Sequence, residues 1–354
     1  MSRIVHVVGT GTIGEPLIGL LANNRKALGI DEVTIHKRTP TPLDQPKIKN
    51  LTHRGAKLCV DDDARQGFKQ MDLEPSFSAE EALERAAVII DCTPTGNVQK
   101  EEIYNRFDNG KRLFLAQGSE FGFGKPYARG INDESLVSGE DRFIQIVSCN
   151  THNIAAIIQN IALEPHGRDN LIEGRFVCIR RANDISQAGS FIPAPEVGKH
   201  KDPRFGTHHA RDANQLFKTM DLDLNLFSSA MKVNTQYMHI IFFNVKLRRP
   251  TDLKTILQQL KSNDRVTRTN QSSSGVVFSF GRDHGHYGRI LNQTVFAQHT
   301  LHVSQDGKEV SGYCFTPQDG NSLLSSVAAA VWHLYPGELT RRLECLQPYF
   351  FSEV

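Results

Sequence analysis

Several features that mark secreted, membrane or nucleic-acid-binding proteins are missing from this sequence. Its six cysteines (59, 92, 149, 178, 314 and 345) are scattered and form no Cys-x-x-Cys pair. This spread argues against a disulfide framework and against a cysteine zinc site. The 41 basic and 39 acidic residues leave a formal net charge of +2, without long blocks of one sign. We therefore expect no metal, no nucleic acid and no anionic membrane surface as a partner.

Long apolar runs are also missing. No stretch approaches the ~18 uninterrupted apolar residues of a membrane-spanning helix. The first residues, MSRIVHVVG, enter a strand-like run without the charged and apolar regions of a secretory signal. We expect a cytoplasmic protein with reduced cysteines. Its 354 residues, 39% of them apolar, suggest two domains with a core in each.

The first motif is a glycine-rich turn near the start. Residues 3–8 are rich in β-branched side chains, and the turn is followed by apolar residues at helical spacing. A strand, Gly-x-Gly-x-x-Gly and a helix, in this order, are typical of a dinucleotide site. The first glycine allows the tight turn, the second lets the pyrophosphate approach and the third allows close helix packing. The predicted cofactor contacts in this turn are Gly9, Gly11, Thr12, Ile13 and Gly14.

A second predicted strand, residues 32–36, ends in Lys37 and Arg38. An NAD site usually has an acidic residue at this point, to bind the ribose hydroxyls. Two cations would instead complement a 2′-phosphate, so we expect NADP, or both cofactors, rather than strict use of NAD. The alternative is a solvated basic loop.

Alternating strands and helices continue up to residue 149. Residues 79–85 predict a helix, while 86–92, 112–117 and 143–147 predict strands. Such alternation indicates an α/β fold with a doubly wound parallel sheet. Ligands bind at the carboxyl ends of such strands. Further expected cofactor contacts are Thr93, Pro94, Gly118 and Asn321, the last in a predicted helix over 321–334 that could pack back on the first domain.

The pattern changes after the helix that follows residue 149. Strand-like runs dominate, which predicts an α+β second domain with a mixed sheet. One helix is expected over 251–261, with Thr251 as its N-cap. Residues 182–215 look irregular, and a loop of this length is often functional. The expected strands are 175–181, 238–247, 275–280, 295–303 and 309–316. We assign 1–149 with 317–354 to the dinucleotide-binding domain and 150–316 to the catalytic domain.

Cys149 stands where the strand 143–147 meets an apolar helix. Exposed N–H groups and the positive end of the helix dipole favour a thiolate at such a junction. A thiolate there is a nucleophile, and neighbouring peptide N–H groups can hold an oxyanion. The alternative is a cysteine that only fills space, since free cysteine is often buried.

Several short motifs together resemble the archaeal-type (type II) glyceraldehyde-3-phosphate dehydrogenases. The resemblance spans most of the chain but is strong only at these short motifs, which we call islands. It implies a Rossmann domain completed by the C-terminal helix, and a catalytic domain with a mixed sheet. The islands are 7–14, 90–94, 117–118, 147–151 (VSCNT), 179–182, 191–193, 208–209, 238–239 and 318–319.

The resemblance also implies roles for residues. Cys149 would attack the aldehyde, and His239 would be the general base. The family typically reads Met-His-x-His, whereas this chain has Ile241 at the second histidine position, so a core role for His239 remains an alternative. If Arg180 and Arg181 continue a strand, they point to opposite faces. The expected substrate and phosphate contacts are Asn150, Thr151, Arg180, Arg181, His208 and His209.

The implied activity is NAD(P)-dependent, phosphorylating oxidation of glyceraldehyde 3-phosphate to 1,3-bisphosphoglycerate, in glycolysis or gluconeogenesis. The expected ligands are the phosphorylated triose aldehyde and inorganic phosphate, and the family implies a homotetramer. Two alternatives stay open. One is a related oxidoreductase that acts on another aldehyde or acyl phosphate, and the other is a nucleotide-binding homologue without turnover.

Overall fold

The computed structural model describes residues 2–118, 120–184, 189, 191–317 and 319–354. The chain divides into two compact units. The first comprises Met1–Lys125, Leu136–Ile146 and Leu323–Gln347, and the second Pro126–Ser135, Val147–Ser322 and Pro348–Val354. This division differs from the expected domains at 126–135, 147–149, 317–322 and 348–354.

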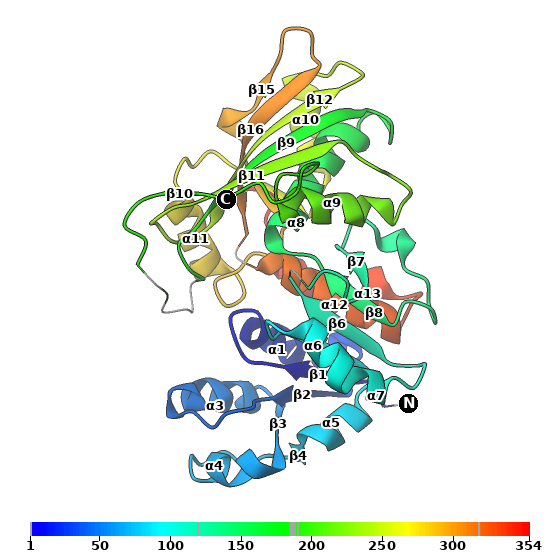
Figure 1. Cartoon of the computed structure of the whole chain (residues 1–354), viewed down its shortest axis with the longest axis vertical. Coiled ribbons are helices and arrows are strands. Elements are labelled where there is room, and N and C mark those ends of the chain that lie inside the picture. The colour runs from blue at the N-terminus through cyan, green and yellow to red at the C-terminus, as the bar shows by residue number, and fades with distance from the viewer. Residues whose placement is uncertain (1, 119, 185–188, 190, 318) are drawn as a thin grey trace. The chain divides into compact units, whose positions relative to one another are not determined.

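The first unit contains a parallel sheet (Figure 1). Its strand order is β4-β3-β2-β1-β5-β6-β8, followed by β7 (Lys125–Tyr127), where the chain passes to the second unit. Each successive pair from β4 to β8 is parallel. The strands are β1 (Ile4–Val8), β2 (Glu32–His36), β3 (Lys57–Val60), β4 (Phe77–Ser78), β5 (Val88–Asp91), β6 (Leu113–Gln117) and β8 (Phe143–Ile146).

Helices cover this sheet because its central strands are apolar on both faces. Every residue of β1 and β6 is buried, as expected for a parallel sheet between helices. The strand predicted over 32–36 and the helix over 79–85 are confirmed to the residue. The unit's longer helices are α1 (Gly14–Asn23), α3 (Gln45–His53), α5 (Ala79–Arg85) and α12 (Gly320–Leu334), the last belonging to this unit from Leu323 onward.

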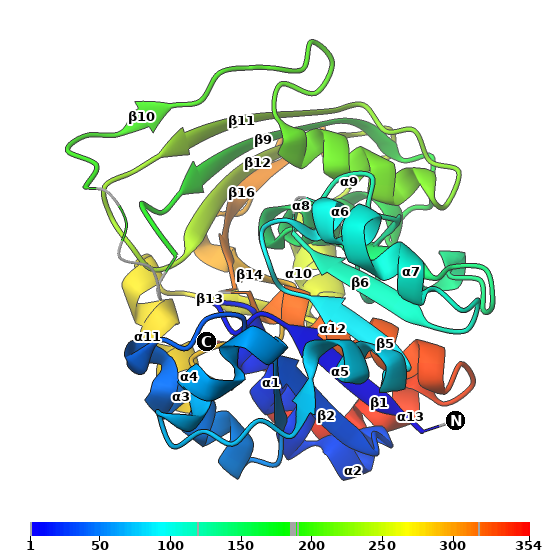
Figure 2. The ribbon, with the colours of Figure 1, turned by 60° about the horizontal axis from the view of Figure 1, so that its bottom comes forward.

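The second unit contains a mixed sheet (Figure 2). β12 pairs antiparallel with β9 and β16, whereas β11–β9 and β13–β14 are parallel pairs. Together with the first sheet, this confirms the predicted fold class. The order is β10-β11-β9-β12-β16-β14-β13, with β9 (Leu171–Arg180), β10 (Glu196–Val197), β11 (Leu226–Lys232), β12 (His239–Leu247), β13 (Val266–Thr269), β14 (Thr294–Ala297), β15 (His302–Val303, beside β16) and β16 (Glu309–Thr316).

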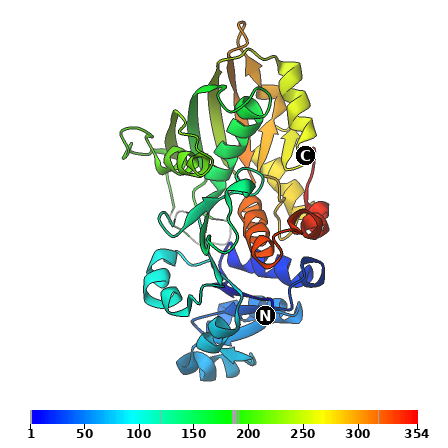
Figure 3. The ribbon, with the colours of Figure 1, turned by 90° about the vertical axis from the view of Figure 1, so that its right-hand side faces the viewer.

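The core of the second unit lies between this sheet and the helices α8 (Cys149–Ile158), α9 (His208–Lys218) and α10 (Leu253–Ser262). Alternate residues of β12 are fully buried, including Ile241 and Phe243. Figure 3 shows α10, in yellow, lying along the sheet. The period of two on β12 fixes which of its side chains enter the core.

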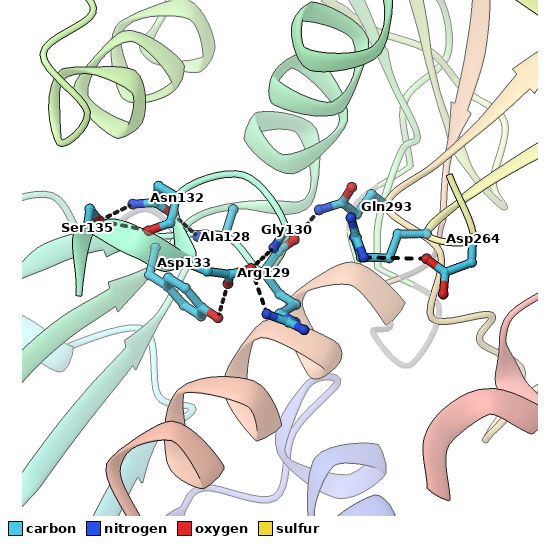
Figure 4. A network of polar contacts seen from close by, with 10 residues as sticks. Ala128, Arg129, Gly130, Asn132, Asp133, Ser135, Asp264 and Gln293 are labelled. Atoms are coloured by element: carbon cyan, nitrogen blue, oxygen red, sulfur yellow. Dashed lines mark hydrogen bonds and ion pairs between the residues drawn. The ribbon is translucent and has the colours of Figure 1, made fainter. Parts of the chain in front are cut away.

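A polar network explains why residues 126–135 belong to the second unit (Figure 4). The Asp133 carboxylate accepts from the Arg129 guanidinium at 2.6 Å and from the Gly130 N–H at 2.9 Å. Asn132 donates to the Thr219 hydroxyl at 2.9 Å, and the Gln293 amide donates to the Arg129 carbonyl. These partners lie far along the sequence, so the segment's attachment could not be predicted from its own residues.

Three local predictions are wrong. Residues 275–280, predicted as a strand, lie in helix α11 (Ser274–His284), because Ser273 accepts from the Gly275 N–H and caps a helix. The N-cap of α10 is Asp252, which accepts from the Thr255 N–H at 2.7 Å, and not Thr251. The region expected to be irregular, 182–215, is not irregular throughout, because helix α9 begins within it at His208. Residues 185–188 and 190 of that region, and residue 318, lie outside the described part of the chain.

The strand predicted over 295–303 is split into β14 and β15 by a 3-10 turn at Gln298–Thr300. In the described residues no helix has the length and apolarity that crossing a membrane requires. The remaining helices are α2 (Arg25–Leu28), α4 (Arg65–Lys69), α6 (Gly96–Gln99), α7 (Asn105–Phe107) and α13 (Leu339–Leu343), with π-turns at Lys100–Tyr104 and Gln159–Leu163 and further 3-10 turns at Pro42–Asp44, Asp62–Ala64, Asp133–Ser135 and Glu344–Tyr349.

Candidate active site

The glycine turn of the first unit leaves room for a ligand where the sequence motif expects one. Gly9 has a φ of +95°, a conformation that favours glycine. A Cβ on Gly14 would lie 2.1 Å from the Gly9 carbonyl oxygen, so this helix must start with glycine. A Cβ on Gly11 would meet no heavy atom within 4 Å. The Gly11 backbone therefore faces open space, as the approach of a pyrophosphate requires.

A cavity of about 790 Å³ opens beside this turn. Its volume is in the range of small-molecule and cofactor sites. Thr12 and Ile13 lead from the turn into α1, and Gly118 follows β6 with a φ of +72°. The cavity is lined by six of the residues predicted to bind the cofactor: Gly9, Gly11, Lys37, Arg38, Thr93 and Pro94.

The positively charged side chains at this cavity differ in whether they form ion pairs. Asp44 bridges two lysines, with 2.7 Å to Lys37 and 3.3 Å to Lys47. Lys47 also donates to the Thr10 carbonyl at 3.3 Å. Arg38 is exposed and has no ion-pair partner among the described residues. The sequence alone does not predict that Lys47, on α3, lines this cavity, because its place there depends on how α3 packs.

In the second unit, Cys149 is the first residue of α8. The Ser148 hydroxyl caps this helix by accepting from the Thr151 N–H at 3.3 Å. Burial, and next the Asp319 carboxylate, raise the pKa of the Cys149 thiol to about 12, although Arg181 and the Asn150 N–H act to lower it. The expectation of a lowered thiol pKa is therefore wrong for this state of the protein. The cost of burying the charge exceeds the help from the helix N-terminus.

His239 begins β12 and is 8% exposed. Its Nδ1 accepts a hydrogen bond from the Arg181 backbone N–H at 3.1 Å. Burial, together with Arg181 and Arg180, lowers the pKa of His239 to about 3, so the ring is neutral. A neutral ring that accepts at Nδ1 carries its proton on Nε2. In this tautomer, His239 offers a donor at Nε2 rather than the free lone pair that a general base needs.

The two adjacent arginines separate as the strand geometry predicts. Arg180 is exposed, whereas Arg181 is 5% exposed. The Arg181 guanidinium donates to Asp184 at 2.6 Å and to the Tyr237 carbonyl at 3.1 Å. It also acts electrostatically on Cys149. Arg181 is therefore the cation of the Cys149 site.

Arg180 acts electrostatically on three histidines, His208, His209 and His239. His208 and His209 open α9, with ring centroids 3.9 Å apart. His209 is 3% exposed, and neither of its ring nitrogens has a hydrogen-bond partner in the described structure. Burial and the neighbouring His208, Arg180 and His239 lower the pKa of His209 well below its usual value. An unpaired buried imidazole is costly unless a ligand bonds to it.

The other residues predicted to contact substrate or cofactor form hydrogen bonds within the protein. The Asn150 side-chain oxygen accepts from the Thr316 hydroxyl at 3.2 Å, and the Thr151 hydroxyl bonds Ser148 at 2.9 Å. Asn321 lies in the second unit, where its amide donates to the Cys149 carbonyl at 3.1 Å. The Asn321 side-chain oxygen is buried without a partner in the described chain. That oxygen can accept a hydrogen bond from a ligand.

Asp319 is a site residue to which the sequence pattern assigned no role. Its carboxylate is 6% exposed and lies 3.9 Å from the Arg289 guanidinium. It also interacts electrostatically with Arg181 and Cys149. The Gln-Asp motif stands out only by its resemblance to the family, and no local pattern marks Asp319 as a neighbour of Cys149. In the described residues, no three potential ligands gather as a metal site would require.

Comparison with known proteins agrees with these observations. No protein-family model matches the chain. It is 25% identical over 321 residues to a glyceraldehyde-3-phosphate dehydrogenase of Metallosphaera sedula, which covers 86% of this chain and 85% of that protein. Proteins of the same name from Hyperthermus butylicus (27% over 301 residues, 80% and 79% covered) and Pyrobaculum arsenaticum (25% over 270 residues, 74% and 71% covered) are also similar.

The chain resembles the archaeal glyceraldehyde-3-phosphate dehydrogenases. The resemblance predicted from the short motifs is thereby confirmed, and it extends over most of the chain. These relatives are dehydrogenases by name, which supports an oxidoreductase.

Proposed function

We propose that this protein is an NAD(P)-dependent, phosphorylating glyceraldehyde-3-phosphate dehydrogenase that acts through Cys149. The observation that carries the proposal is the placement of Cys149 at the start of α8, in the electrostatic reach of the buried Arg181. The similarity to dehydrogenases of this name supplies the substrate class. The product would be 1,3-bisphosphoglycerate.

The chain's own residues supply most of the chemistry. The Cys149 thiol releases its proton to solvent water, its sulfur adds to the aldehyde carbon, and the carbonyl oxygen becomes an oxyanion. The Nε2–H of His239, held on the Arg181 amide, is the candidate donor to that oxygen. Loss of hydride from the former aldehyde carbon, for which a bound nicotinamide would be the acceptor, leaves a thioester on Cys149. Attack by phosphate then forms the acyl phosphate and returns the sulfur.

Arg180, His208 and His209 supply the candidate site for phosphate groups. His209 brings two unpaired ring nitrogens and Arg180 a fixed positive charge. An anion there would satisfy the buried imidazole, which otherwise carries a desolvation cost. We propose that these residues bind the substrate phosphate or the attacking phosphate.

The residues at the first-unit cavity fit a dinucleotide. Gly11 leaves room for the pyrophosphate, and Arg38 has an uncommitted charge for a 2′-phosphate. The cofactor would supply the hydride acceptor. Lys47 and Lys37 add positive charge, but Asp44 already engages both, and a carboxylate can also accept from ribose hydroxyls. We propose use of NADP or NAD, with Arg38 favouring NADP.

One observation keeps a second candidate open. Ile241 occupies the place of the second histidine in the family's run, and it is fully buried in the core of the second unit. The chain therefore offers no imidazole there. A related enzyme for another aldehyde or acyl phosphate, or a nucleotide-binding homologue without turnover, fits this departure.

We also propose that the protein is cytoplasmic and, as the family resemblance implies, a homotetramer. Among the outward-facing residues of the second sheet, Phe242 is half-buried and Tyr313 is exposed, with ring centroids 5.2 Å apart. A second copy could cover this apolar face. Light scattering after size exclusion gives the mass in solution, and a monomer would contradict this part.

The decisive assay is the reduction of NAD and NADP with glyceraldehyde 3-phosphate, with and without phosphate. We expect phosphate-dependent turnover that is lost in Cys149→Ser. An Arg38→Met variant should raise the KM for NADP about 10-fold and leave that for NAD nearly unchanged, because it removes only the charge for the 2′-phosphate. Cofactor binding without turnover would favour the non-catalytic homologue.

A further inference from the structure

The Asp44 carboxylate lies between two lysines at the cavity of the first unit. Its Oδ2 is 2.7 Å from the Lys37 ammonium, and its Oδ1 is 3.3 Å from the Lys47 ammonium. All three residues line the cavity, and their side chains are between 20% and 26% exposed. Because these side chains are mostly buried, solvent screens the two ion pairs less than it would screen fully exposed ones.

Asp44 does not use its carboxylate to cap α3. It stands at the N-cap position, where an aspartate usually accepts a hydrogen bond from a backbone N–H of the helix, but its side chain makes no such bond. Partial burial acts to raise the pKa of Asp44, yet Lys37 and Lys47 hold it below its usual value, so the carboxylate is ionised at neutral pH. Asp44 therefore spends its charge on the two lysines.

Of the two lysines, Lys47 has further contacts. It lies 3.7 Å from the Glu15 carboxylate and donates to the Thr10 carbonyl at 3.3 Å. Lys37 has Asp44 as its ion-pair partner. In the described part of the chain, Asp44 is the carboxylate that pairs with both lysines. Loss of its charge would leave Lys37 without a counter-ion and Lys47 with only the more distant Glu15.

The other charged residues that line the cavity do not contact this group. Asp61 pairs with the His36 Nε2 at 3.2 Å, and Glu102 forms no ion pair in the described structure. Arg38 follows Lys37 in the sequence and is exposed, without an ion-pair partner among the described residues. Of the three cations here, Arg38 is thus the uncommitted one.

The two nicotinamide dinucleotides differ in charge at the place where this group lies. In dinucleotide sites the ribose 2′ position is bound near the end of the second strand, and Lys37 directly follows β2. A phosphate monoester carries a charge of about −1.5 to −2 near pH 7, so it is repelled by a carboxylate and competes with it for the lysines. A 2′-hydroxyl brings no charge and can donate to a carboxylate. Asp44 therefore disfavours the 2′-phosphate selectively.

We propose that Asp44 is a specificity-determining residue that lowers the preference for NADP over NAD by neutralising Lys37 and Lys47. The inference rests on the proposed binding of a nicotinamide dinucleotide at this cavity. Arg38 attracts the 2′-phosphate, while Asp44 withholds the two lysines from it. The balance between them lets the protein use both cofactors.

The test is calorimetric titration of the protein, without substrate, with NADPH and with NADH. In Asp44→Asn, the Kd for NADH divided by the Kd for NADPH should rise about 10-fold, because two cations become available to the phosphate. Asp61→Asn is the matched control, since it removes the same charge from the same cavity but releases no lysine. Its ratio should change less than about 3-fold.

Two further variants test the cause of the effect. Asp44→Ser also removes the charge and keeps a residue suited to the N-cap, so it should give a similar rise. Adding Lys47→Met to Asp44→Asn should reverse much of the gain for NADPH, because one released cation is then missing. Thermal unfolding shows whether each variant is folded.

An unchanged or lower ratio in the folded Asp44 variants would overturn the proposal. An equal rise in Asp61→Asn would also overturn it, because net charge alone would then set the preference. Both of these results leave cofactor binding intact, so they are distinct from a failure of the proposed function. Wild-type protein that binds neither NADPH nor NADH would overturn the proposed cofactor site, and this inference with it.

Discussion

At the scale of single residues, one backbone hydrogen bond determines what His239 can do. The Arg181 N–H occupies Nδ1 at 3.1 Å and leaves the proton on Nε2. A general base at Nε2 would need the other tautomer, for which the Arg181 amide would have to find another acceptor. The arrangement suits a hydrogen-bond donor to a developing oxyanion, and that role needs no histidine at the position of Ile241.

Variants of His239 separate a donor from a base. Glutamine places an N–H near the position of Nε2 but cannot act as a base, and phenylalanine provides neither. If His239 acts as a donor, we expect His239→Phe to lower kcat by about 100-fold and His239→Gln to keep distinctly more activity. Steady-state kinetics measure both. Equal loss in the two variants would instead indicate a general base, and full activity of His239→Phe would leave His239 without a catalytic role.

Cys149 shows the limit of prediction at this scale. Its position between a strand and a helix could be read from the apolar residues on either side, because both patterns are local. Its raised pKa could not, since it arises from burial and from Asp319, 170 positions further along the sequence. Local sequence predicts where Cys149 stands, whereas its ionisation depends on tertiary packing.

At the scale of elements, strands and helices with a clear apolar period were predictable. The buried strand at 32–36, the strand at 309–316 and the helix at 79–85 match to the residue. The run at 275–280 was ambiguous, because short apolar runs do not distinguish a strand from a helix by period alone. The decisive signal was Ser273, a helix cap, which stands outside the run.

The start of α10 gives a test with an internal control. Asp252 accepts from the Thr255 N–H at 2.7 Å, whereas the Thr251 hydroxyl has no hydrogen-bond partner in the described structure. Asp252→Ala should therefore lower the free energy of unfolding by about 1 kcal/mol, and Thr251→Ala should change it much less. Urea unfolding of the two variants measures the difference. A larger loss for Thr251→Ala would contradict the observed cap.

Two glycines of the turn before α1 allow an effect on stability to be distinguished from an effect on ligand binding. The Cβ of Gly14→Ala would press on the Gly9 carbonyl, so this variant should lose ~1–3 kcal/mol of stability. The Cβ of Gly11→Ala meets open space, so the fold should tolerate it. Because that space is where the pyrophosphate is expected, Gly11→Ala should weaken cofactor binding about 10-fold or more. Calorimetry with NADPH and thermal unfolding test the pair, and unimpaired binding by Gly11→Ala would contradict the predicted site.

At the scale of the whole molecule, the site residues come from segments far apart in the sequence. The Cys149 site combines the start of α8, the end of β9 and the start of α12. The cavity of the first unit combines the glycine turn with Lys47 from α3. Residues at strand ends could be predicted because the fold class places those ends together. Asp319 and Lys47 could not, because nothing in the local sequence distinguishes them from the other charged residues of the chain.

Both units bury neutral histidines, and this makes stability depend on pH. Burial lowers the pKa of His6 in the first unit and of His239 in the second to about 3, and that of His152 to about 4. In the unfolded chain each binds a proton near pH 6.5. Between pH 6.5 and 4 the unfolded state therefore binds more protons, and the free energy of unfolding falls as the pH falls. Above pH 6.5 this stability is fully present.

The free energy of unfolding should change by up to ~1.4 kcal/mol per pH unit for each histidine, or by about 4 kcal/mol per pH unit for the three together. Asp91 and Asp319, whose pKa values are raised by burial, act in the opposite direction as the pH approaches their own pKa values, so the net slope is smaller there. We expect the thermal midpoint to fall between pH 7 and pH 5. His6→Asn can keep the bond to Thr34 without titrating and should reduce the slope by about one histidine's share. An identical slope in that variant would mean that His6 titrates normally, and that burial does not keep it neutral.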